Sequence, residues 1–496
     1  MPLKKTLNYL REHPEAVGLI AILALSALLR LASLHAPFDR DEGQYATIAQ
    51  VILRGGLPYR DAIEIKPPGT FYLYALAIYI FGATIEAVRT FTAVYALLTA
   101  VAVYLVSRQI AGSRAALGAT LLYGVFSTVP QLQGISNTEV FLVLPMIAGV
   151  WCFLQALDTR KRRYLYGAGL CASLAMLIKP VALPVVALEF LLIPCFGSGP
   201  GRWKQAILDL AAFLAPVVAC ALATLCYFYL RGGLDDFLYW TVVVPRRYKD
   251  AEIFLVPPVS AVVRYLHTAL LVPALLGIPA AFWLALTRRT IPGLLPLLLI
   301  LAVSLAVTLP GKNHPHYFIM LIPFLAIPAG AGLVLITRLP RVPACLALAV
   351  VSGLFVFSLW ENYRFYTVYT PEEAVTATYG SSIFVDSANL ARYLKEHTSP
   401  QDYIFQWGFE PELYFLADRR CPNPYLVSLL PDWSDDPVQA INRMQQSLLD
   451  KKPAYLVLQP EWSNYGGIFE IREYIRKNCY EETKAGYAVI YRCSAK

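Results

Sequence analysis

The sequence predicts a polytopic α-helical membrane protein with about eleven transmembrane helices and a C-terminal extracytoplasmic α/β domain. Hydrophobic residues make up 57% of the 496 residues, and charged residues only 15%. Several apolar runs reach the length of about 20 residues that a helix needs to cross a bilayer. After Trp360 the apolar runs shorten, and charged and turn residues return. We therefore expect a transmembrane domain over 1–360 and a soluble domain over 361–496.

The membrane region begins with an apolar run near 17–34 that follows a basic stretch. Arg30 interrupts the end of this run and no small-residue cleavage site follows, so we interpret the run as a retained anchor. Lysine and arginine concentrate in short loops such as 160–163, which marks these loops as cytoplasmic. The net charge of +8 reflects these topology signals, and we expect no nucleic-acid partner.

This charge pattern places the N-terminus in the cytoplasm and the C-terminal domain outside the cell's inner (plasma) membrane. The predicted spans lie near 17–34, 87–108, 115–131, 138–157, 164–179, 181–196, 206–230, 262–286, 291–309, 316–337 and 342–359.

Two segments leave the number of spans open. The halves on either side of Lys179-Pro180 are shorter than about 20 residues, so they form two short spans or one kinked hairpin. Counting 69–82 as a crossing would put Arg108 and the basic loop at 160–163 outside, against the positive-inside rule. We therefore expect 69–82, which is rich in tyrosine, to lie in the outer interface as an amphipathic helix.

In the C-terminal domain, predicted helices alternate with short apolar strands, a pattern typical of an α/β layer. The expected helices cover 388–396, 437–450 and 468–477, and the expected strands cover 403–407, 454–459, 479–483 and 487–492. The last two strands form a hairpin with Cys479 and Cys493 roughly opposite each other. In an oxidising compartment these two could form a disulfide and leave Cys421 single. No glycine signature of a nucleotide site accompanies the strands.

Most of the charge in the N-terminal part of the chain gathers in the loop that follows the first span. Between residues 39 and 66 this loop holds Asp39, Asp41, Glu42, Asp61 and Glu64 together with Arg40, Arg54, Arg60 and Lys66. Ionisable groups at membrane depth are costly and are functional candidates by default. We therefore expect the functional centre in this loop.

Three carboxylates are the candidates for acid–base chemistry. Asp41 and Glu42 lie just beyond the first span, and Glu139 opens the fourth. On the predicted topology all three face one outer cavity. A carboxylate in a partly dry site can serve as a general base, and a second acidic group can orient or tune it. The alternative is structural, with Asp39 and Asp41 capping a short helix that begins at Gly43.

Several cationic side chains in the predicted outer loops are suited to binding a phosphate group. Lys66 precedes two prolines, which fix the local backbone and hold it extended. Arg246 and Arg247 lie in a later outer loop, and Lys312 and His316 lie at the mouth of the tenth predicted span. Such charge-assisted donors are what a phosphoryl leaving group needs. Alternatively, these cations reach lipid headgroups at the interface.

The loop resembles the first outer loop of GT-C fold glycosyltransferases related to protein O-mannosyltransferases. This branch also includes the lipid A aminoarabinose transferases and the RgtA/B/C/D-like sugar transferases. The resemblance rests on Asp41-Glu42 with Tyr45, on Gly56-Leu57-Pro58-Tyr59 and on Lys66-Pro67-Pro68. It continues through Phe81-Gly82, Arg89, Glu139, Lys179-Pro180, His316-Tyr317 and Pro323. It covers most of the membrane region.

The resemblance implies an inverting hexosyl- or pentosyltransferase that takes a monosaccharide from a polyprenyl-phosphate donor at the outer face of the membrane. It implies Asp41 as the catalytic base and Lys66 beside the leaving phosphate, with Arg246, Arg247 or His316 assisting. Glu139 takes the second acidic position, where many relatives have aspartate. The expected supporting residues are Glu42, Tyr45, Tyr59, Glu64, Arg89, Lys312 and Tyr317.

Other partners and functions stay open. The acceptor can be a lipid, a polysaccharide or a protein, and the spans would bind the polyprenyl tail. Some relatives are thought to use a divalent metal, for which Asp41, Glu42 and Glu139 could supply oxygen ligands. His314 and His316 alone are weak evidence for a metal. The alternatives to a transferase are a transporter or flippase of an anionic, lipid-linked solute, and a relative that binds lipid-linked sugars without catalysis.

Overall fold

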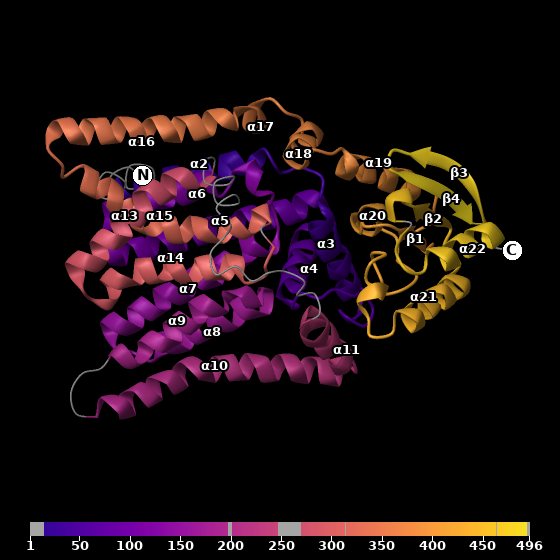
Figure 1. Ribbon diagram of the computed structural model, residues 1–496, viewed down its shortest axis with the longest axis horizontal. Helices are drawn as coiled ribbons and strands as arrows, with labels where there is room; N and C mark the ends of the chain where they lie inside the picture. Colours follow the sequence, from indigo (N-terminus) through magenta and orange to yellow (C-terminus); the bar gives the residue numbers. More distant parts are fainter. Residues whose placement is uncertain (1–13, 197–200, 247–268, 313, 463, 494–496) are drawn as a thin grey trace, which may run out of the picture. The chain divides into compact units, whose positions relative to one another are not determined.

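The structure is a computed structural model that describes residues 14–196, 201–246, 269–312, 314–462 and 464–493 (Figure 1). The chain forms two compact units, each assembled from three stretches of sequence. The first unit takes its described residues from 1–33, 90–223 and 251–369, and the second from 34–89, 224–250 and 370–496. The boundary at residue 360 that the sequence suggests stays a prediction.

The first unit is helical. It contains α2 (Pro14–Leu31), most of α5 (Ile85–Ala111), α6 (Ser113–Phe126), α7 (Thr138–Thr159), α8 (Arg163–Ile178), α9 (Leu183–Leu192), most of α10 (Arg202–Leu230), α13 (Leu271–Arg288), α14 (Ile291–Thr308), α15 (Leu321–Ile336), α16 (Arg341–Glu361) and α17 (Tyr363–Thr367). Short 3₁₀ turns include η1 (Pro130–Leu132), η2 (Pro180–Ala182), η3 (Ile193–Phe196) and η7 (Pro315–Met320).

Within the described part of the chain, eight helices are long and apolar enough to cross a membrane: α2, α5, α7, α10, α13, α14, η7 with α15, and α16. They confirm the polytopic helical fold that the sequence predicts. Helices α8 and α9 with its flanking turns are shorter apolar segments, so eleven crossings stay a prediction. The start of the predicted span 262–286 lies outside the described residues.

Small residues let the helices of the first unit pack closely. A Cβ atom added to Gly330 in α15 would lie 2.0 Å from the carbonyl oxygen of Ala115 in α6. One added to Gly169 in α8 would lie 2.0 Å from the carbonyl oxygen of Phe213 in α10. Membrane helices approach each other most closely where side chains are smallest. Glycine is therefore required at both crossings.

The second unit combines the loop after the first span with the C-terminal residues. It contains α3 (Arg40–Leu53), α4 (Gly69–Phe81), α11 (Leu234–Leu238), η4 (Tyr239–Val243), η5 (Val244–Arg246), α18 (Pro371–Tyr379), α19 (Ile383–Glu396), α20 (Glu412–Ala417), η8 (Pro431–Trp433), α21 (Pro437–Lys451), η9 (Pro460–Trp462) and α22 (Ile468–Asn478). Its strands are β1 (Ile404–Trp407), β2 (Tyr455–Leu458), β3 (Cys479–Ala485) and β4 (Ala488–Cys493).

Helix α4 corresponds to the segment 69–82 that we expected to be amphipathic. The helix forms, but its sequence carries no charged residue and no polar face. Phe71 and Tyr74 are buried, and their rings pack against the Tyr45 ring of α3, with centroids 5.9 and 5.6 Å away. Tyr79, on another face, is 79% exposed. The expectation of an amphipathic helix was wrong, because burial against α3 replaces a polar face.

The four strands form one mixed sheet in the order β1-β2-β4-β3, with helices α19 to α22 around it (Figure 1). Strands β1 and β2 run parallel, and the other two pairs are antiparallel. All residues of β1 and β2 are buried, as expected of strands covered on both faces. The α/β layer and its four strands are confirmed, with ends that differ by a few residues from the prediction.

Helix α18 was missed in the sequence although it carries a clear start signal. The Thr370 hydroxyl accepts a hydrogen bond from the Glu373 backbone, and the Glu373 carboxylate accepts one from the Thr370 backbone. Pro371 occupies the first helical position, where its missing N–H costs nothing. The six-residue helix α20, by contrast, has no side-chain cap and is too short to show a period.

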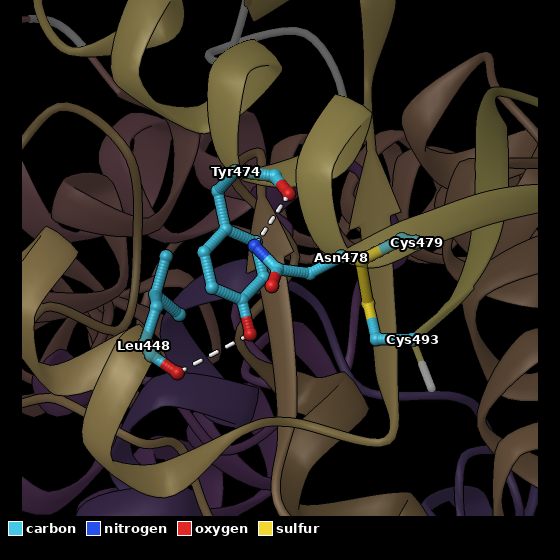
Figure 2. Close-up of a disulfide and its surroundings, with 5 residues drawn as sticks. All are labelled: Leu448, Tyr474, Asn478, Cys479 and Cys493. Atoms are coloured by element: carbon cyan, nitrogen blue, oxygen red, sulfur yellow. Dashed lines mark hydrogen bonds between the residues drawn. A yellow bond between two sulfur atoms is a disulfide. The ribbon is translucent and has the colours of Figure 1, made fainter. Parts of the chain in front are cut away.

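The predicted disulfide between Cys479 and Cys493 is present and joins the outer ends of β3 and β4 (Figure 2). Cys421 is not disulfide-bonded. Next to the bridge, the Asn478 amide donates to the Tyr474 carbonyl at 2.9 Å, and the Tyr474 hydroxyl donates to the Leu448 carbonyl at 3.2 Å. The bridge therefore closes the hairpin at the end of a helix that is itself tied to α21.

Replacing both bridged cysteines, Cys479→Ser with Cys493→Ser, should lower the local opening free energy of this hairpin by about 2–3 kcal/mol, because the cross-link restricts the open chain. Hydrogen exchange of the β3 and β4 amides in the full-length protein measures this change. The matched control is Cys421→Ser, which breaks no bridge. Equal protection of the hairpin in both variants would contradict the prediction.

Candidate active site

Helix α3 carries Asp41, and a capping box fixes its start. The Asp39 carboxylate accepts a hydrogen bond from the Glu42 N–H at 2.9 Å, and the Asp39 N–H donates to the Glu42 carboxylate at 3.1 Å. The helix therefore begins at Arg40, not at Gly43. Asp39 is the cap, as the structural alternative proposed, but Asp41 lies in the first turn and is not part of the cap.

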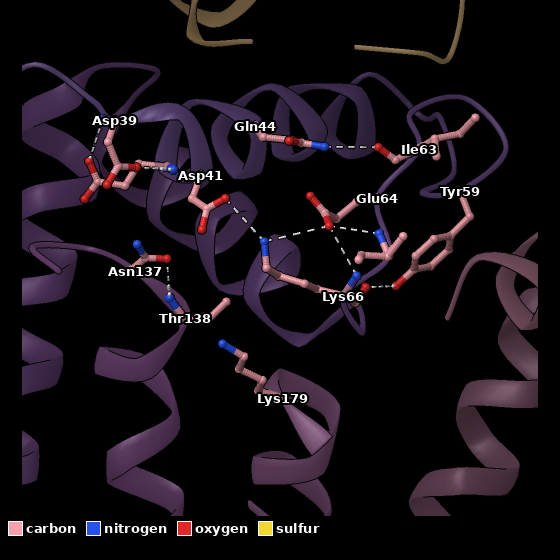
Figure 3. Close-up of polar contacts among 12 residues, drawn as sticks. Asp39, Asp41, Gln44, Tyr59, Ile63, Glu64, Lys66, Asn137, Thr138 and Lys179 are labelled. Atoms are coloured by element: carbon pink, nitrogen blue, oxygen red, sulfur yellow. Dashed lines mark hydrogen bonds and ion pairs between the residues drawn. The ribbon is translucent and has the colours of Figure 1, made fainter. Parts of the chain in front are cut away.

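The side chains of Asp41 and Lys66 form the central ion pair of the second unit. The Lys66 ammonium lies 3.3 Å from an Asp41 oxygen and 3.8 Å from a Glu64 oxygen (Figure 3). It also lies 5.0 Å from the centroid of the Tyr45 ring. Asp41 and Tyr45 are four residues apart and share one face of α3. The structure thus brings four sequence-predicted residues together.

The backbone around Lys66 is held on both sides. The Tyr59 hydroxyl donates to the Lys66 carbonyl at 2.9 Å, and a Glu64 oxygen accepts the Ile65 N–H at 2.8 Å. Tyr59 is buried and has φ 73°, a left-handed conformation that is costly for a bulky residue. Strain of this kind persists only where the surroundings fix the conformation. The loop therefore holds the Lys66 backbone in one position.

Solvent reaches this ion pair only in part, since the Asp41 side chain is 34% exposed and that of Lys66 22%. Burial disfavours the charged ammonium, but the carboxylates of Asp41 and Glu64 outweigh it and hold the pKa of Lys66 well above its ordinary value. Lys66 is therefore a cation at neutral pH. A ligand phosphate can meet it at the exposed edge of the pair.

Glu42 and Arg89 form a second ion pair, and both side chains are 2% exposed. Arg89 also donates to the carbonyls of Ala36 and Pro37 at 3.2 and 3.3 Å. Glu42 was expected to face an outer cavity beside Asp41, and this was wrong. It is the next residue along the helix and so points about 100° away from Asp41, into the protein interior. The pair fixes the chain that enters α3.

The C-terminal residues of the second unit also hold the start of α3. The Tyr379 hydroxyl, from α18, donates to the Asp39 carboxylate at 2.6 Å. Arg40 forms an ion pair with the fully buried Glu410 at 2.8 Å. A Cβ atom on Gly43 would lie 2.3 Å from the Glu412 Cβ, so α3 approaches α20 at glycine distance. These contacts position the helix that presents Asp41.

Asp39 has an unusual protonation equilibrium. Burial, and then the neighbouring Glu42 and Asp41, raise the pKa of Asp39 to about 8, although two hydrogen bonds oppose the shift. The folded protein therefore binds a proton here that the unfolded chain releases near pH 4. This group favours the folded state most below pH 4, and its contribution is lost as the pH rises to about 8.

The variant Asp39→Asn keeps a good N-cap residue and removes this titration. We expect its Tm, relative to that of the wild type, to rise steadily between pH 4 and 8, because only the wild type loses stability over that interval. Thermal unfolding in detergent micelles across this range measures the difference. A Tm difference that does not change with pH would contradict the assignment.

In the first unit, Glu139 lies in the first turn of α7 and is buried. Its carboxylate forms an ion pair with Lys179 and accepts a hydrogen bond from the Thr138 hydroxyl at 2.9 Å. The Lys179 ammonium lies 4.0 Å from the centroid of the Tyr317 ring. A negative residue at a helix N-terminus also suits the helix dipole. Glu139 and Tyr317 are thus brought together by Lys179.

The remaining predicted cations have less defined surroundings. The His316 ring stacks on His314 with centroids 5.4 Å apart and meets the Tyr317 ring edge-on at 4.8 Å. Lys312 is partly buried in the loop after α14, and Arg246 is exposed at the end of η5. Arg247 lies outside the described residues. The phosphate-binding role of this group stays a prediction.

The carboxylates suggested as metal ligands are the next feature of the site. In that part of the chain, no group of three or more histidine, cysteine, aspartate or glutamate residues is arranged to hold a metal ion. Glu42, one of the three suggested oxygen ligands, is instead bound to Arg89. Within the described residues, the three suggested oxygen ligands therefore do not come together as a metal site.

Three residues near the predicted sites were assigned no role in the site from the sequence. Lys179 entered only as the break between two short apolar segments and as part of the family resemblance, although a lysine between apolar segments is itself a functional signal. Tyr379 and Glu410 lie 340 and 370 residues from their partners Asp39 and Arg40. No local pattern reveals such contacts, because they depend on how distant elements pack.

Together these features define a polytopic membrane protein with a polar, partly exposed acid–lysine pair in an ordered loop after its first span. Residues 65–231 match the family of dolichyl-phosphate-mannose-protein mannosyltransferases. The match covers about a third of the chain and includes Lys66 and Glu139.

Among curated proteins, the chain is 28% identical over 243 residues to an undecaprenyl phosphate-alpha-4-amino-4-deoxy-L-arabinose arabinosyl transferase of Pseudomonas aeruginosa. It is 26% identical over 243 residues to the transferase of the same name from Pseudomonas savastanoi. These matches span 45% and 46% of this chain, and only 41% and 43% of the relatives.

Among solved structures, the ArnT of Cupriavidus metallidurans bound to undecaprenyl phosphate matches with a TM-score of 0.66 and 16% identity. The match covers 97% of this chain and 98% of that one. The Archaeoglobus fulgidus oligosaccharyltransferase tethered to an acceptor peptide matches with a TM-score of 0.54 and 14% identity, over 98% and 75% of the two chains. The resemblance to GT-C fold glycosyltransferases of the mannosyltransferase and aminoarabinose transferase group is thereby confirmed.

Proposed function

We propose that this protein is an inverting glycosyltransferase of the membrane that moves a monosaccharide from a polyprenyl-phosphate donor to an acceptor at the outer face. The observation that carries the proposal is the ion pair of Asp41 and Lys66, 3.3 Å apart and partly exposed to solvent. In this proposal Asp41 is the base and Lys66 is the phosphate-binding cation. The relatives' names and the bound undecaprenyl phosphate in one neighbour support a lipid-phosphate donor.

In the proposed reaction, Asp41 takes the proton of an acceptor hydroxyl, whose oxygen attacks the anomeric carbon of the sugar. A new carbon–oxygen bond forms on one face while the bond to the phosphate oxygen breaks on the other, which inverts the anomeric centre. The polyprenyl phosphate leaves with the electron pair, and the Lys66 ammonium neutralises its developing charge. No nucleotide is needed, in keeping with the lack of a nucleotide signature in the sequence.

Supporting roles follow from the contacts. Glu64 and Tyr45 also contact the Lys66 ammonium and help to hold it beside Asp41. Glu139, paired with Lys179, is the proposed second acidic group. Arg246, Arg247, Lys312 and His316 are proposed to meet the phosphate or nearby headgroups, and the apolar spans to bind the polyprenyl tail. The sugar and the acceptor, whether lipid, polysaccharide or protein, are to be found by experiment.

The direct test uses the purified protein in lipid with a panel of polyprenyl-phosphate sugars. Mass spectrometry records whether water or an added acceptor extract releases polyprenyl phosphate. Lys66→Ala should reduce release by about 10²–10³-fold, the effect of removing one donor to a developing charge. The control Lys477→Ala removes an exposed lysine of α22 that pairs with Glu473, and should release at the wild-type rate.

Two outcomes would count against the proposal. Release that is equal in Lys66→Ala and Lys477→Ala would remove Lys66 from the reaction. No release from any donor, with a lipid-linked sugar tightly retained, would favour the alternatives of transport or binding without catalysis.

A further inference from the structure

The second unit contains a cavity of about 600 Å³ that the proposed chemistry does not use. Its lining comes from the loop 59–63, the segment 236–240, residues 424–425, and α21 with the residues just before it. All these stretches belong to the same compact unit. The volume falls within the range typical of sites for small ligands.

Aromatic rings supply much of the cavity wall, including Tyr59, Tyr239, Trp240 and Tyr425. Tyr59, Trp240 and Tyr425 are buried, so their positions are set by packing. The Tyr239 hydroxyl accepts a hydrogen bond from the Asp435 N–H at 2.6 Å, which fixes the fourth ring. Of the four, Tyr239 is partly exposed, and its flat, fixed ring suits the C–H-rich face of a sugar, because both surfaces are apolar and lose water on contact.

Polar side chains occupy the rest of the wall. Asp236 lies on the short helix α11, and Gln439, Arg443 and Gln446 project from α21 into the lining. These groups alternate acceptors with donors, which is the combination that a set of ring hydroxyls requires. Asp436 also lines the cavity but is used as the cap of α21, where it accepts the Gln439 N–H at 2.9 Å.

The charge of the lining is unfavourable for an anion. Arg60 lines the cavity, but its guanidinium is engaged by Asp61 at 2.8 Å and by the Arg231 carbonyl at 3.1 Å. The other arginine of the lining is Arg443, and the lining also contains three carboxylates, those of Asp236, Asp435 and Asp436. A lining with more negative than positive charge repels phosphate and accepts hydroxyl or ammonium groups.

We propose that this cavity binds a saccharide that carries hydroxyl or amino groups and no phosphate, as the sugar portion of the acceptor. The identification of this saccharide as part of the acceptor rests on the proposed function. The binding chemistry itself is argued from the cavity lining alone. Tyr59 connects the two sites, since this residue contributes to the cavity lining and its hydroxyl donates to the Lys66 carbonyl at 2.9 Å. A bound saccharide would therefore rest against the loop that positions the reactive pair.

The test is saturation-transfer NMR on the full-length protein in lipid nanodiscs, with three probes: maltose, a glucosamine disaccharide and glucose 6-phosphate. The two disaccharides should bind, and glucose 6-phosphate should bind at least about ten-fold more weakly. Tyr239→Ala should raise the disaccharide Kd by about ten-fold through loss of an aromatic face. Gln439→Ala should raise it by about three- to ten-fold through loss of a hydrogen bond.

The matched control is Gln445→Ala, which removes an amide from the same helix outside the cavity lining and should leave the Kd unchanged. Tyr239→Ala could disturb folding, but Gln439 is exposed, so Gln439→Ala keeps the test valid. Binding of glucose 6-phosphate as tight as that of the disaccharides would overturn the inference. So would no binding of any probe, or equal Kd values in Gln439→Ala and Gln445→Ala.

Failure of this inference can be told apart from failure of the proposed function. Hydrolytic release of polyprenyl phosphate depends on Asp41 and Lys66 and needs no acceptor sugar. Release without disaccharide binding would leave the transferase in place and remove the cavity from it. Disaccharide binding without release from any donor would leave a saccharide site on a protein that is not a transferase.

Discussion

Replacing Asp41 with asparagine is expected to lower the rate of sugar transfer by about 10²–10⁴-fold, the usual contribution of a general base. Asparagine has nearly the same shape, and Asp39, not Asp41, caps α3, so the fold should be kept. The neutral amide cannot accept a proton from the acceptor hydroxyl. Donor binding should survive, because Lys66 still has Glu64 beside it, 3.8 Å away.

The measurement compares release of polyprenyl phosphate with retention of the donor in the same preparation. Asp418→Asn is the matched control, because Asp418 pairs with Arg54 at the other end of α3 and is half exposed. That exposed pair contributes little to stability. Wild-type transfer by Asp41→Asn would exclude Asp41 as an essential base. Loss of donor binding together with transfer would instead assign Asp41 a binding role.

The class of the fold could be predicted from the sequence because membrane spans and short strands leave local patterns. The apolar runs gave the helices, and alternation of helices with strands gave the α/β layer. The disulfide could also be anticipated, since a hairpin fixes which cysteines lie opposite each other, and Cys479 indeed pairs with Cys493 in the register of β3 and β4.

The sequence indicated which residues belong to the site, but not which of them contact each other. Asp41 and Lys66 stand out as charges beside an apolar span, but 25 residues separate them and their contact depends on how the loop folds back. Neighbours in sequence also diverge in space. Asp41 is open to solvent in part while Glu42 is buried, because successive helical residues point about 100° apart.

The cavity beside Tyr59 could not be predicted from the sequence, because it too depends on how distant segments pack. Its lining comes from residues 59–63, 236–240 and 424–447, which lie far apart in the sequence, and none of these segments carries a motif of its own. Tyr59 was selected only through the family resemblance, and its left-handed backbone was not foreseen, since tyrosine is among the residues that avoid this conformation. Positions of this kind emerge only from packing.

Removing Arg89 should have the largest effect on stability. In Arg89→Met the Glu42 carboxylate stays buried without its partner, and breaking a buried ion pair in this way costs about 3–5 kcal/mol. The carbonyls of Ala36 and Pro37 lose their donor as well. Thermal and chemical unfolding in lipid micelles should show this loss. The control Arg54→Met removes an arginine whose pair with Asp418 is exposed, and should change stability little.

The double variant Arg89→Met with Glu42→Gln distinguishes two effects of losing Arg89. One is the unpaired charge of Glu42, and the other is the loss of the contacts that the arginine makes with backbone carbonyls. Neutralising Glu42 removes the buried, unpaired charge, so the double variant should regain part of the lost stability. Glutamine can still accept the Asp39 N–H of the capping box. If stability returns but transfer does not, the pair serves to orient Asp41 through the start of α3. If the single and double variants are equally unstable, the loss comes from the arginine's carbonyl contacts and not from the unpaired Glu42 charge.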